Sequence, residues 1–140
     1  MTRAADPLTA QVISLFARVT ERYTREYEAA AAQHGLTPQQ VKALLALDEQ
    51  PLPMRRVAER LGAQPSNLTS VIDRLQSRGL VERHADPDDR RVKLLATTET
   101  GASAARELRE RLRFARDPLI ALTQDQRRDL RDLLELIMGS

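Results

Sequence analysis

The chain has 140 residues, of which 41% are hydrophobic, with 22 Lys or Arg against 20 Asp or Glu and no cysteine. This length fits one domain with its own core, and the lack of cysteine excludes disulfides, thiolate metal sites and thiol-based redox sensing. Because the sequence has neither a run of roughly 18 apolar residues nor a signal-peptide pattern after Met1, we expect a soluble cytoplasmic protein without a membrane segment.

The first third of the chain predicts two helices. Apolar residues recur at helical spacing over residues 8–33, which predicts a long first helix. The second helix has complete start signals, because Thr37 is a good N-cap, Pro38 suits the first helical position and Gln40 can close a capping box. It should end before residues 51–53, whose Pro-Leu-Pro sequence predicts a rigid joint.

The middle of the chain predicts a helix, a tight turn and a second helix. Gly62 can adopt the positive φ needed after the first of these helices, and Pro65 is pre-shaped for the start of the second, which should end at Arg78 and Gly79. One face of the second helix is apolar at i, i+3, i+4 and i+7. These apolar residues are Leu68, Val71, Ile72 and Leu75.

The opposite face of this helix is polar and suits contact with the edges of DNA bases, since short side chains let the backbone approach closely. Its predicted DNA-binding residues are Ser66, Asn67, Thr69, Ser70 and Arg74. An ordinary solvated helix surface is the alternative. Asp73 also lies on this side, and because an acid would repel phosphates we expect it to orient an arginine.

A two-stranded ribbon is predicted next, from residues 80–84 and 92–95, joined by a turn rich in Asp and Pro. Arg91 and Arg90, near the tip of this turn, suit a phosphate or minor-groove contact. An ordinary solvated turn is the alternative for them. The positive charge is concentrated in this part of the chain, because residues 53–93 have nine Lys or Arg and six Asp or Glu.

Two more helices should follow the ribbon. One begins after Thr98 and should run until Pro118, and the last begins at a second capping box in residues 123–126. The first and last helices have wide apolar stripes that a compact unit of residues 36–97 does not need. A second copy of the chain is the simplest partner for these stripes.

Four short motifs occur in order along the chain. They are Val57–Leu61 (Val-Ala-x-x-Leu), Asn67–Leu75 (Asn-x-Thr-x-x-x-Asp-x-Leu), Arg78–Arg83 (Arg-Gly-Leu-Val-x-Arg) and Asp89–Arg91. Together they resemble the MarR family of bacterial transcriptional regulators, and the resemblance covers nearly the whole chain. The sequence departs from the family pattern at Gln64, where the usual Ser is a better N-cap.

The resemblance implies a mostly α (α+β) fold, a winged helix-turn-helix with long N- and C-terminal dimerisation helices and a two-stranded β-wing. Residues 1–140 would form a single MarR-type domain, with a DNA-binding part (36–97) and helical dimerisation parts (1–34 and 98–140). In resembling proteins the wing aspartate, here Asp89, braces the recognition helix, and Arg74 is its expected partner.

The implied function is that of a homodimer that binds a pseudo-palindromic operator in double-stranded DNA. A repressor is favoured over an activator, because occupying the operator blocks polymerase without any further contact surface. The resemblance also implies a small aromatic or anionic effector, bound between the first helix, the helix after the wing and the DNA-binding part. The expected lining residues are Phe16, Tyr23, Tyr27, His34, Met54 and Phe114, for each of which core or interface packing is the alternative.

The sequence offers no constellation of catalytic or metal-binding residues. His34 and His84 have no ligand-spaced Asp, Glu or second His, and Asp88 and Asp89 have no nucleophile nearby. We therefore expect no metal, no cofactor and no enzyme activity. The alternative is a small all-helical dimeric enzyme or interaction module with an incidental helix-turn-helix pattern, which would lack a salt-dependent affinity for DNA.

Overall fold

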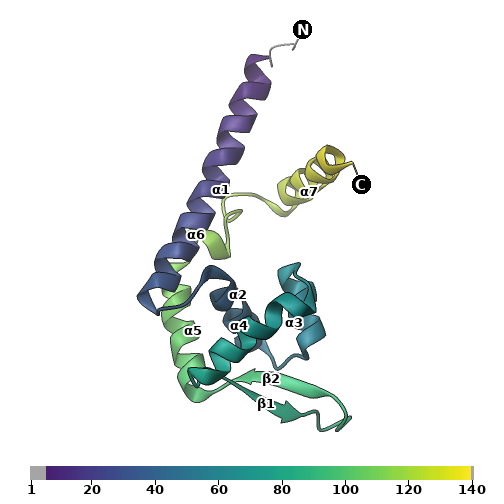
Figure 1. Ribbon diagram of the computed structural model, residues 1–140. Helices are drawn as coiled ribbons and strands as arrows, with labels where there is room; N and C mark the ends of the chain where they lie inside the picture. The colour runs from purple at the N-terminus through teal and green to yellow at the C-terminus, as the bar shows by residue number, and fades with distance from the viewer. Residues whose placement is uncertain (1–5, 140) are drawn as a thin grey trace.

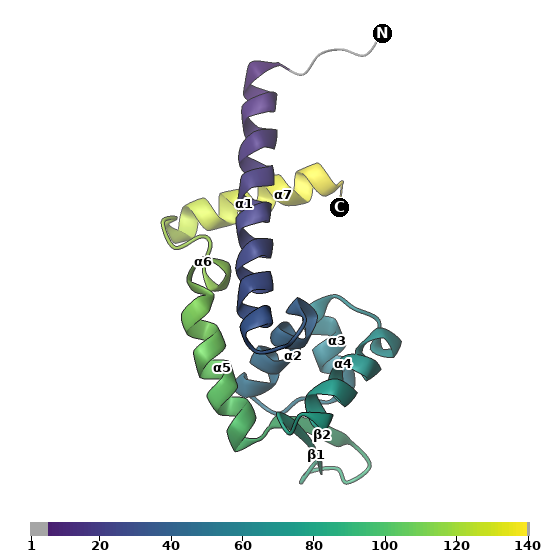
Figure 2. The same cartoon turned by 60° about the vertical axis from the view of Figure 1, so that its left-hand side comes forward.

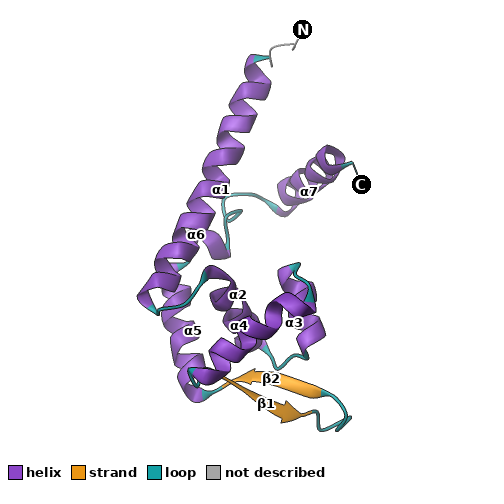
Figure 3. Ribbon diagram, viewed as in Figure 1, coloured by secondary structure: helices purple, strands orange, loops and turns teal. Residues whose placement is uncertain are grey.

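The computed structural model describes residues 6–139 and has the predicted mostly α architecture with one β-hairpin (Figures 1 and 3). Its elements are α1 (Pro7–Gln33), α2 (Pro38–Glu49), α3 (Met54–Leu61), α4 (Pro65–Ser77), β1 (Val81–Ala85), β2 (Lys93–Thr97), α5 (Glu99–Arg111), α6 (Arg113–Arg116) and α7 (Gln124–Met138). The helix pair α3–α4 followed by the hairpin β1–β2 is a winged helix-turn-helix, so the predicted fold class is confirmed.

Capping residues form the helix ends that the sequence predicts. The Thr37 hydroxyl accepts a hydrogen bond from the Gln40 backbone N–H at 3.2 Å, and the Gln40 side chain accepts one from the Thr37 N–H at 3.0 Å. The same capping box forms between Thr123 and Gln126 at the start of α7. Gly62 ends α3 with a φ of 63°, a left-handed conformation that a side chain would strain.

The core lies around α2, which packs against α1, α3, α4, α5 and β2. Leu44 and Leu47 of α2 meet apolar side chains from α4 and α5 in one cluster. All four residues of the predicted apolar face of α4 are buried: Leu68, Val71, Ile72 and Leu75. The helical register predicted for α4 is therefore confirmed, and its polar side faces solvent.

The hairpin β1–β2, here called the wing together with its turn, pairs antiparallel with Val81 opposite Thr97. Its strands begin one residue later than predicted. The Leu80 N–H donates to the Leu75 carbonyl at the end of α4, so it is not available to the ladder. Leu52 exchanges two hydrogen bonds with Leu95, at 3.0 and 2.8 Å. The segment 51–53 therefore connects α2 to α3 and also pairs with β2 through one antiparallel β-bridge.

The helix expected to run from Thr98 to Pro118 is interrupted at Leu112, so this prediction was wrong. Leu112 is fully buried with φ −110° and ψ 39°, outside the helical region. The Glu26 carboxylate of α1 accepts hydrogen bonds from the backbone N–H groups of Phe114 (3.3 Å) and Ala115 (2.8 Å). Glu26 thus supplies, from another helix, the cap that the start of α6 lacks.

The N-terminal half of α1 and the whole of α7 lie outside the core. Figures 1 and 2 show the N-terminal half of α1 extending beyond the other helices and α7 set apart from the helices α2–α4 and the wing. In α7, all of whose residues are described, none is buried. The large hydrophobic residues that face solvent are Leu8, Val12, Ile13, Leu15, Phe16, Val19, Ile120, Leu133, Leu136, Ile137 and Met138. Within residues 6–139 no helix has the length and apolar character needed to cross a membrane.

Candidate nucleic-acid interface

The polar side of α4 forms one surface next to the wing. Its five predicted DNA-binding residues are all exposed: Ser66, Asn67, Thr69, Ser70 and Arg74. The Thr69 hydroxyl donates weakly to the Pro65 carbonyl at 3.4 Å, which keeps this side chain close to the helix. The structure therefore presents a row of short polar side chains over which another backbone could come close.

The N-terminal end of α4 has no side-chain cap, as the Gln64 departure predicted. Pro65 occupies the first helical position and has no N–H of its own. The remaining N–H groups of the first turn and the helix dipole give this end a partial positive charge, which favours an anion such as a DNA phosphate.

The wing tip is ordered by its own aspartates. Asp89 Oδ1 accepts from the backbone N–H of Arg91 at 3.1 Å and from its Nε at 3.2 Å, and Asp86 Oδ1 accepts from the Asp88 N–H at 2.9 Å. The Arg91 side chain is 92% exposed, and its two terminal nitrogens have no hydrogen-bond partner among the described residues. Arg90 is also exposed and has no ion pair within residues 6–139. The tip thus presents two cations to solvent.

A brace joins the wing to α4, but it uses other residues than those predicted. Asp89 contacts Arg91 and not Arg74, which has no ion pair in the described part of the chain. Instead, Arg83 of β1 donates from Nη2 to Asp73 Oδ1 at 3.1 Å and from Nε to Gln76 Oε1 at 3.0 Å. The expectation that Asp73 orients an arginine is therefore confirmed, and Arg74 stays free to face a ligand.

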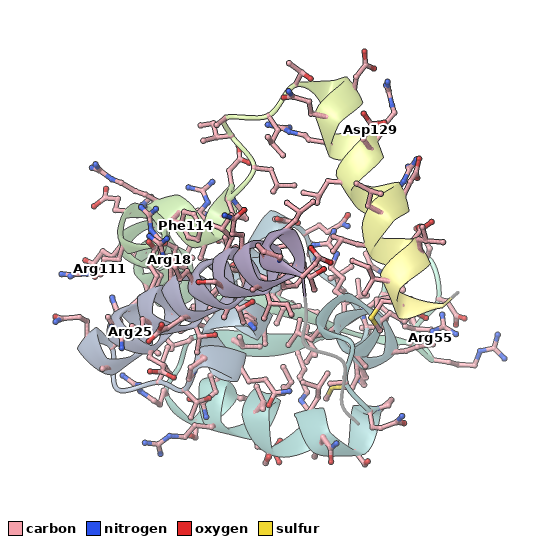
Figure 4. The ribbon with its side chains drawn as sticks, turned by 90° about the horizontal axis from the view of Figure 1, so that it is seen from above. Arg18, Arg25, Arg55, Arg111, Phe114 and Asp129 are labelled. Carbon is pink, nitrogen blue, oxygen red and sulfur yellow. The ribbon has the colours of Figure 1, made fainter. Side chains whose placement is uncertain are left out.

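The six residues expected to line an effector site do not share a cavity. Only Tyr23 and Tyr27 line the same crevice. The others lie apart: Phe16 faces a groove between α1 and α7, Phe114 lies with Arg18 and Arg25 along another groove beside α1 (Figure 4), His34 borders α5, and Met54 packs against the core. The sequence could not distinguish these surroundings, because helical spacing shows which residues share a face but not what that face packs against.

The crevice that holds the two tyrosines has a volume of about 510 Å³ and lies among α1, α2, α3, α5 and α6. Lys42 Nζ lies 5.3 Å from the ring centre of Tyr23 and 5.0 Å from that of Tyr27. Burial raises the pKa of Tyr27 to about 12, so its hydroxyl stays neutral at physiological pH.

Four cations line this crevice, and two of them are neutralised. Arg60 pairs with Glu49, and Arg109 pairs with Asp48. The other two, Lys42 and Arg116, have no ion pair among the described residues. The arrangement suits a flat organic anion. Within residues 6–139, no three His, Asp or Glu side chains converge in a group that could hold a metal ion.

Three kinds of comparison with known proteins give consistent results. The family model described as the MarR family matches residues 34–92. Over 80 residues the chain is 32% identical to the HTH-type transcriptional regulator YcgE of Bacillus subtilis. That match covers 56% of this chain and 52% of YcgE, so the chain spans about half the length of that curated relative.

Two of the similar solved structures carry the name CouR. CouR from Rhodococcus jostii RHA1, bound to p-coumaroyl-CoA, superposes with a TM-score of 0.76 at 29% identity, over 95% of each chain. The transcriptional repressor CouR bound to a 23-mer DNA duplex gives a TM-score of 0.68 at 27% identity, over 99% of each chain.

Proposed function

Because the chain belongs to the MarR family of transcriptional regulators, which are not enzymes, we propose that it is a repressor that binds an operator as a homodimer. The observation that carries this proposal is the exposed polar face of α4, held beside a wing with two exposed arginines at its tip. Asn67 and its neighbours on α4 would read base edges in the major groove, while Arg90 and Arg91 would contact phosphates or the minor groove.

Dimerisation would use the terminal helices. A groove of about 350 Å³ between α1 and α7 is lined by the exposed Val12 and Phe16 and the half-buried Leu130 and Leu134. Further apolar residues of both helices face solvent outside this groove. A monomer rarely leaves so much apolar surface in water, and a second copy placed by a two-fold axis would cover it. Two α4 helices would then lie about 34 Å apart and read two half-sites of a pseudo-palindrome.

Repression is favoured over activation by two considerations. A dimer that occupies an operator blocks polymerase without further contacts, and one of the similar solved structures is named as that of a transcriptional repressor bound to DNA. A protein with this function would act in the cytoplasm, where the chromosome of a bacterium lies.

The proposal is tested by selecting genomic DNA fragments with the purified protein. We expect one or a few fragments to be enriched, each containing two inverted half-sites about one helical turn apart. The fragment should be protected from cleavage over both half-sites. A protein that enriches no fragment over the starting pool would not be a sequence-specific regulator.

We further propose that a flat organic anion releases the operator by binding in the crevice of Tyr23 and Tyr27. Lys42 and Arg116 are the unpaired cations that would hold its acidic group. CouR binds p-coumaroyl-CoA, so p-coumarate and p-coumaroyl-CoA are the first probes. Either probe should lower operator affinity, and Lys42→Gln should abolish this effect, whereas Arg106→Gln, on an exposed part of α5, should not. Equal release from both variants would place the effector elsewhere.

A further inference from the structure

The C-terminal ends of α1 and α4 meet through one guanidinium group. Arg78, the C-cap residue of α4, donates from Nη1 to the carbonyls of His34 at 2.6 Å and Gly35 at 3.0 Å. His34 is in turn the C-cap residue of α1. One side chain therefore joins the C-terminal end of α4 to the C-terminal end of α1.

Arg78 places a positive charge at the C-terminal end of α1. A helix leaves its last carbonyls unsatisfied and its C-terminus partially negative, so a cation there is stabilising. The last turn of α1 has no basic residue, and Arg78 supplies one from the far end of α4. Hydrogen bonds from a charged donor are shorter and stronger than neutral ones, which agrees with the 2.6 Å contact.

Gly35, whose carbonyl is one of the two that Arg78 contacts, has a φ of 63°, a left-handed conformation that favours glycine. Otherwise α1 and α4 are connected mainly through α2, which packs against both. The Arg78 contact is therefore a direct link, at the end of α4 remote from Ser66 and Asn67, which face the expected DNA.

We propose that Arg78 is a positioning residue that sets the spacing of half-sites the dimer accepts. This role rests on the proposed function, in which α1 belongs to the dimer interface and α4 reads DNA. If α1 is fixed against the partner subunit, the Arg78 link fixes the direction of α4 relative to the two-fold axis. Inserting one base pair between half-sites separates them by about 3.4 Å and rotates them by about 35°, which a stiff dimer cannot follow.

The test compares spacing tolerance with simple affinity. Operators with the selected spacer, and with one base pair added or removed, are titrated with the wild-type protein, Arg78→Ala and Arg78→Lys. Wild type should lose at least about tenfold in affinity on either change, since a displaced half-site loses several base contacts. Arg78→Ala should lose no more than about threefold, because α4 can then reorient. Arg78→Lys should retain most of the wild-type discrimination, as its ammonium can still donate to the two carbonyls.

Controls separate this role from a general effect on folding. Ser77→Ala removes a hydroxyl that bonds only to the Arg74 carbonyl, and Arg106→Ala removes an exposed charge on α5, so both should discriminate spacers as wild type does. Dimer mass and affinity for one half-site are measured for every variant. If Arg78→Ala fails to fold, Arg78→Met, which keeps an apolar stem and removes the donor, takes its place.

Two outcomes contradict the proposal in different ways. Spacer discrimination equal to wild type in a folded Arg78→Ala or Arg78→Met dimer would overturn the role of Arg78 and leave the proposed function intact. A wild-type protein that binds no operator, or binds all spacings equally, would overturn the proposed dimeric repressor itself, and the role of Arg78 with it.

Discussion

Arg83 Nη2 of β1 lies 3.1 Å from Asp73 Oδ1 of α4, and this ion pair joins the wing to α4. Arg83 also donates to Gln76 one turn further along α4, so its guanidinium spans two positions of the same helix. The wing arginines and the polar face of α4 are thereby held in one geometry. A surface assembled in this way can contact a groove and the adjacent backbone together.

We expect Asp73→Asn and Arg83→Gln each to weaken operator binding by a similar factor, on the order of threefold to tenfold, because each change frees the wing from α4. Both side chains are partly exposed, so thermal stability should change little. A double-mutant cycle on operator affinity measures the coupling. If the effects of the two substitutions simply add, the pair does not act as a brace.

Arg91→Ala should weaken binding to the operator and to random DNA by similar factors. Its side chain is 92% exposed at the wing tip, where in the proposed function it would contact phosphates or the minor groove rather than read base identity. The salt dependence of log affinity should flatten by about one unit of slope if one phosphate contact is lost. Loss of discrimination with unchanged affinity for random DNA would contradict this role.

Neighbouring positions on α4 should differ sharply. Asn67→Ala and Thr69→Ala should relax sequence preference, because a good base contact contributes about 1–3 kcal/mol of discrimination, and should leave melting nearly unchanged. Leu68 is fully buried, so Leu68→Ala should lower the free energy of unfolding by about 2–5 kcal/mol. Thermal melts and binding-site selection on the three variants measure both effects. An Asn67→Ala protein that unfolds while Leu68→Ala melts normally would refute the assigned register.

Removing residues 123–140 should abolish the dimer and tight operator binding. Leu133, Leu136 and Ile137 of α7 face solvent in a single copy of the chain, and we expect a partner subunit to bury them. Sedimentation of the shortened chain measures the mass directly. Leu136→Asp with Ile137→Asp offers the same test in the full-length chain. Persistence of a stable dimer in both would place the interface elsewhere.

The parts of the fold that local chemistry determines could be predicted from the sequence. The capping boxes at Thr37 and Thr123 need only residues three positions apart, and both form. The buried and exposed faces of α4 follow from helical periodicity, which fixes Leu68 inside and Asn67 outside. The polar face of α4, the candidate DNA-binding surface, could therefore be located from the sequence.

Features that depend on distant residues could not be predicted. The break at Leu112 is supported by Glu26, a residue 88 positions away from Phe114, and nothing near Leu112 signals it. Gly101 lies where α5 meets the start of the wing, and a Cβ there would come within 1.9 Å of the Leu80 carbonyl oxygen. A sequence pattern shows that a glycine is present but not which backbone approaches it.

The residues that join the wing to α4 could not be predicted correctly for a related reason. Both Arg83 and Asp73 belong to the recognised motifs, but their contact depends on how the hairpin lies against α4. The alternation of a short strand indicates which residues share a face, not which helix that face meets. The assignment to Asp89 and Arg74 came from resemblance alone, and the local turn at the wing tip engages Asp89 with Arg91 instead.

The most direct test of the central claim is the affinity of the purified protein for its selected operator and for a scrambled duplex, measured across a range of salt concentrations. A dimeric reader of DNA should bind the operator more tightly at every salt concentration, and the logarithm of both affinities should fall linearly with the logarithm of salt as counterions are released. Affinities that are equal for the two duplexes and independent of salt would contradict the claim, and would favour an interaction module with an incidental helix-turn-helix.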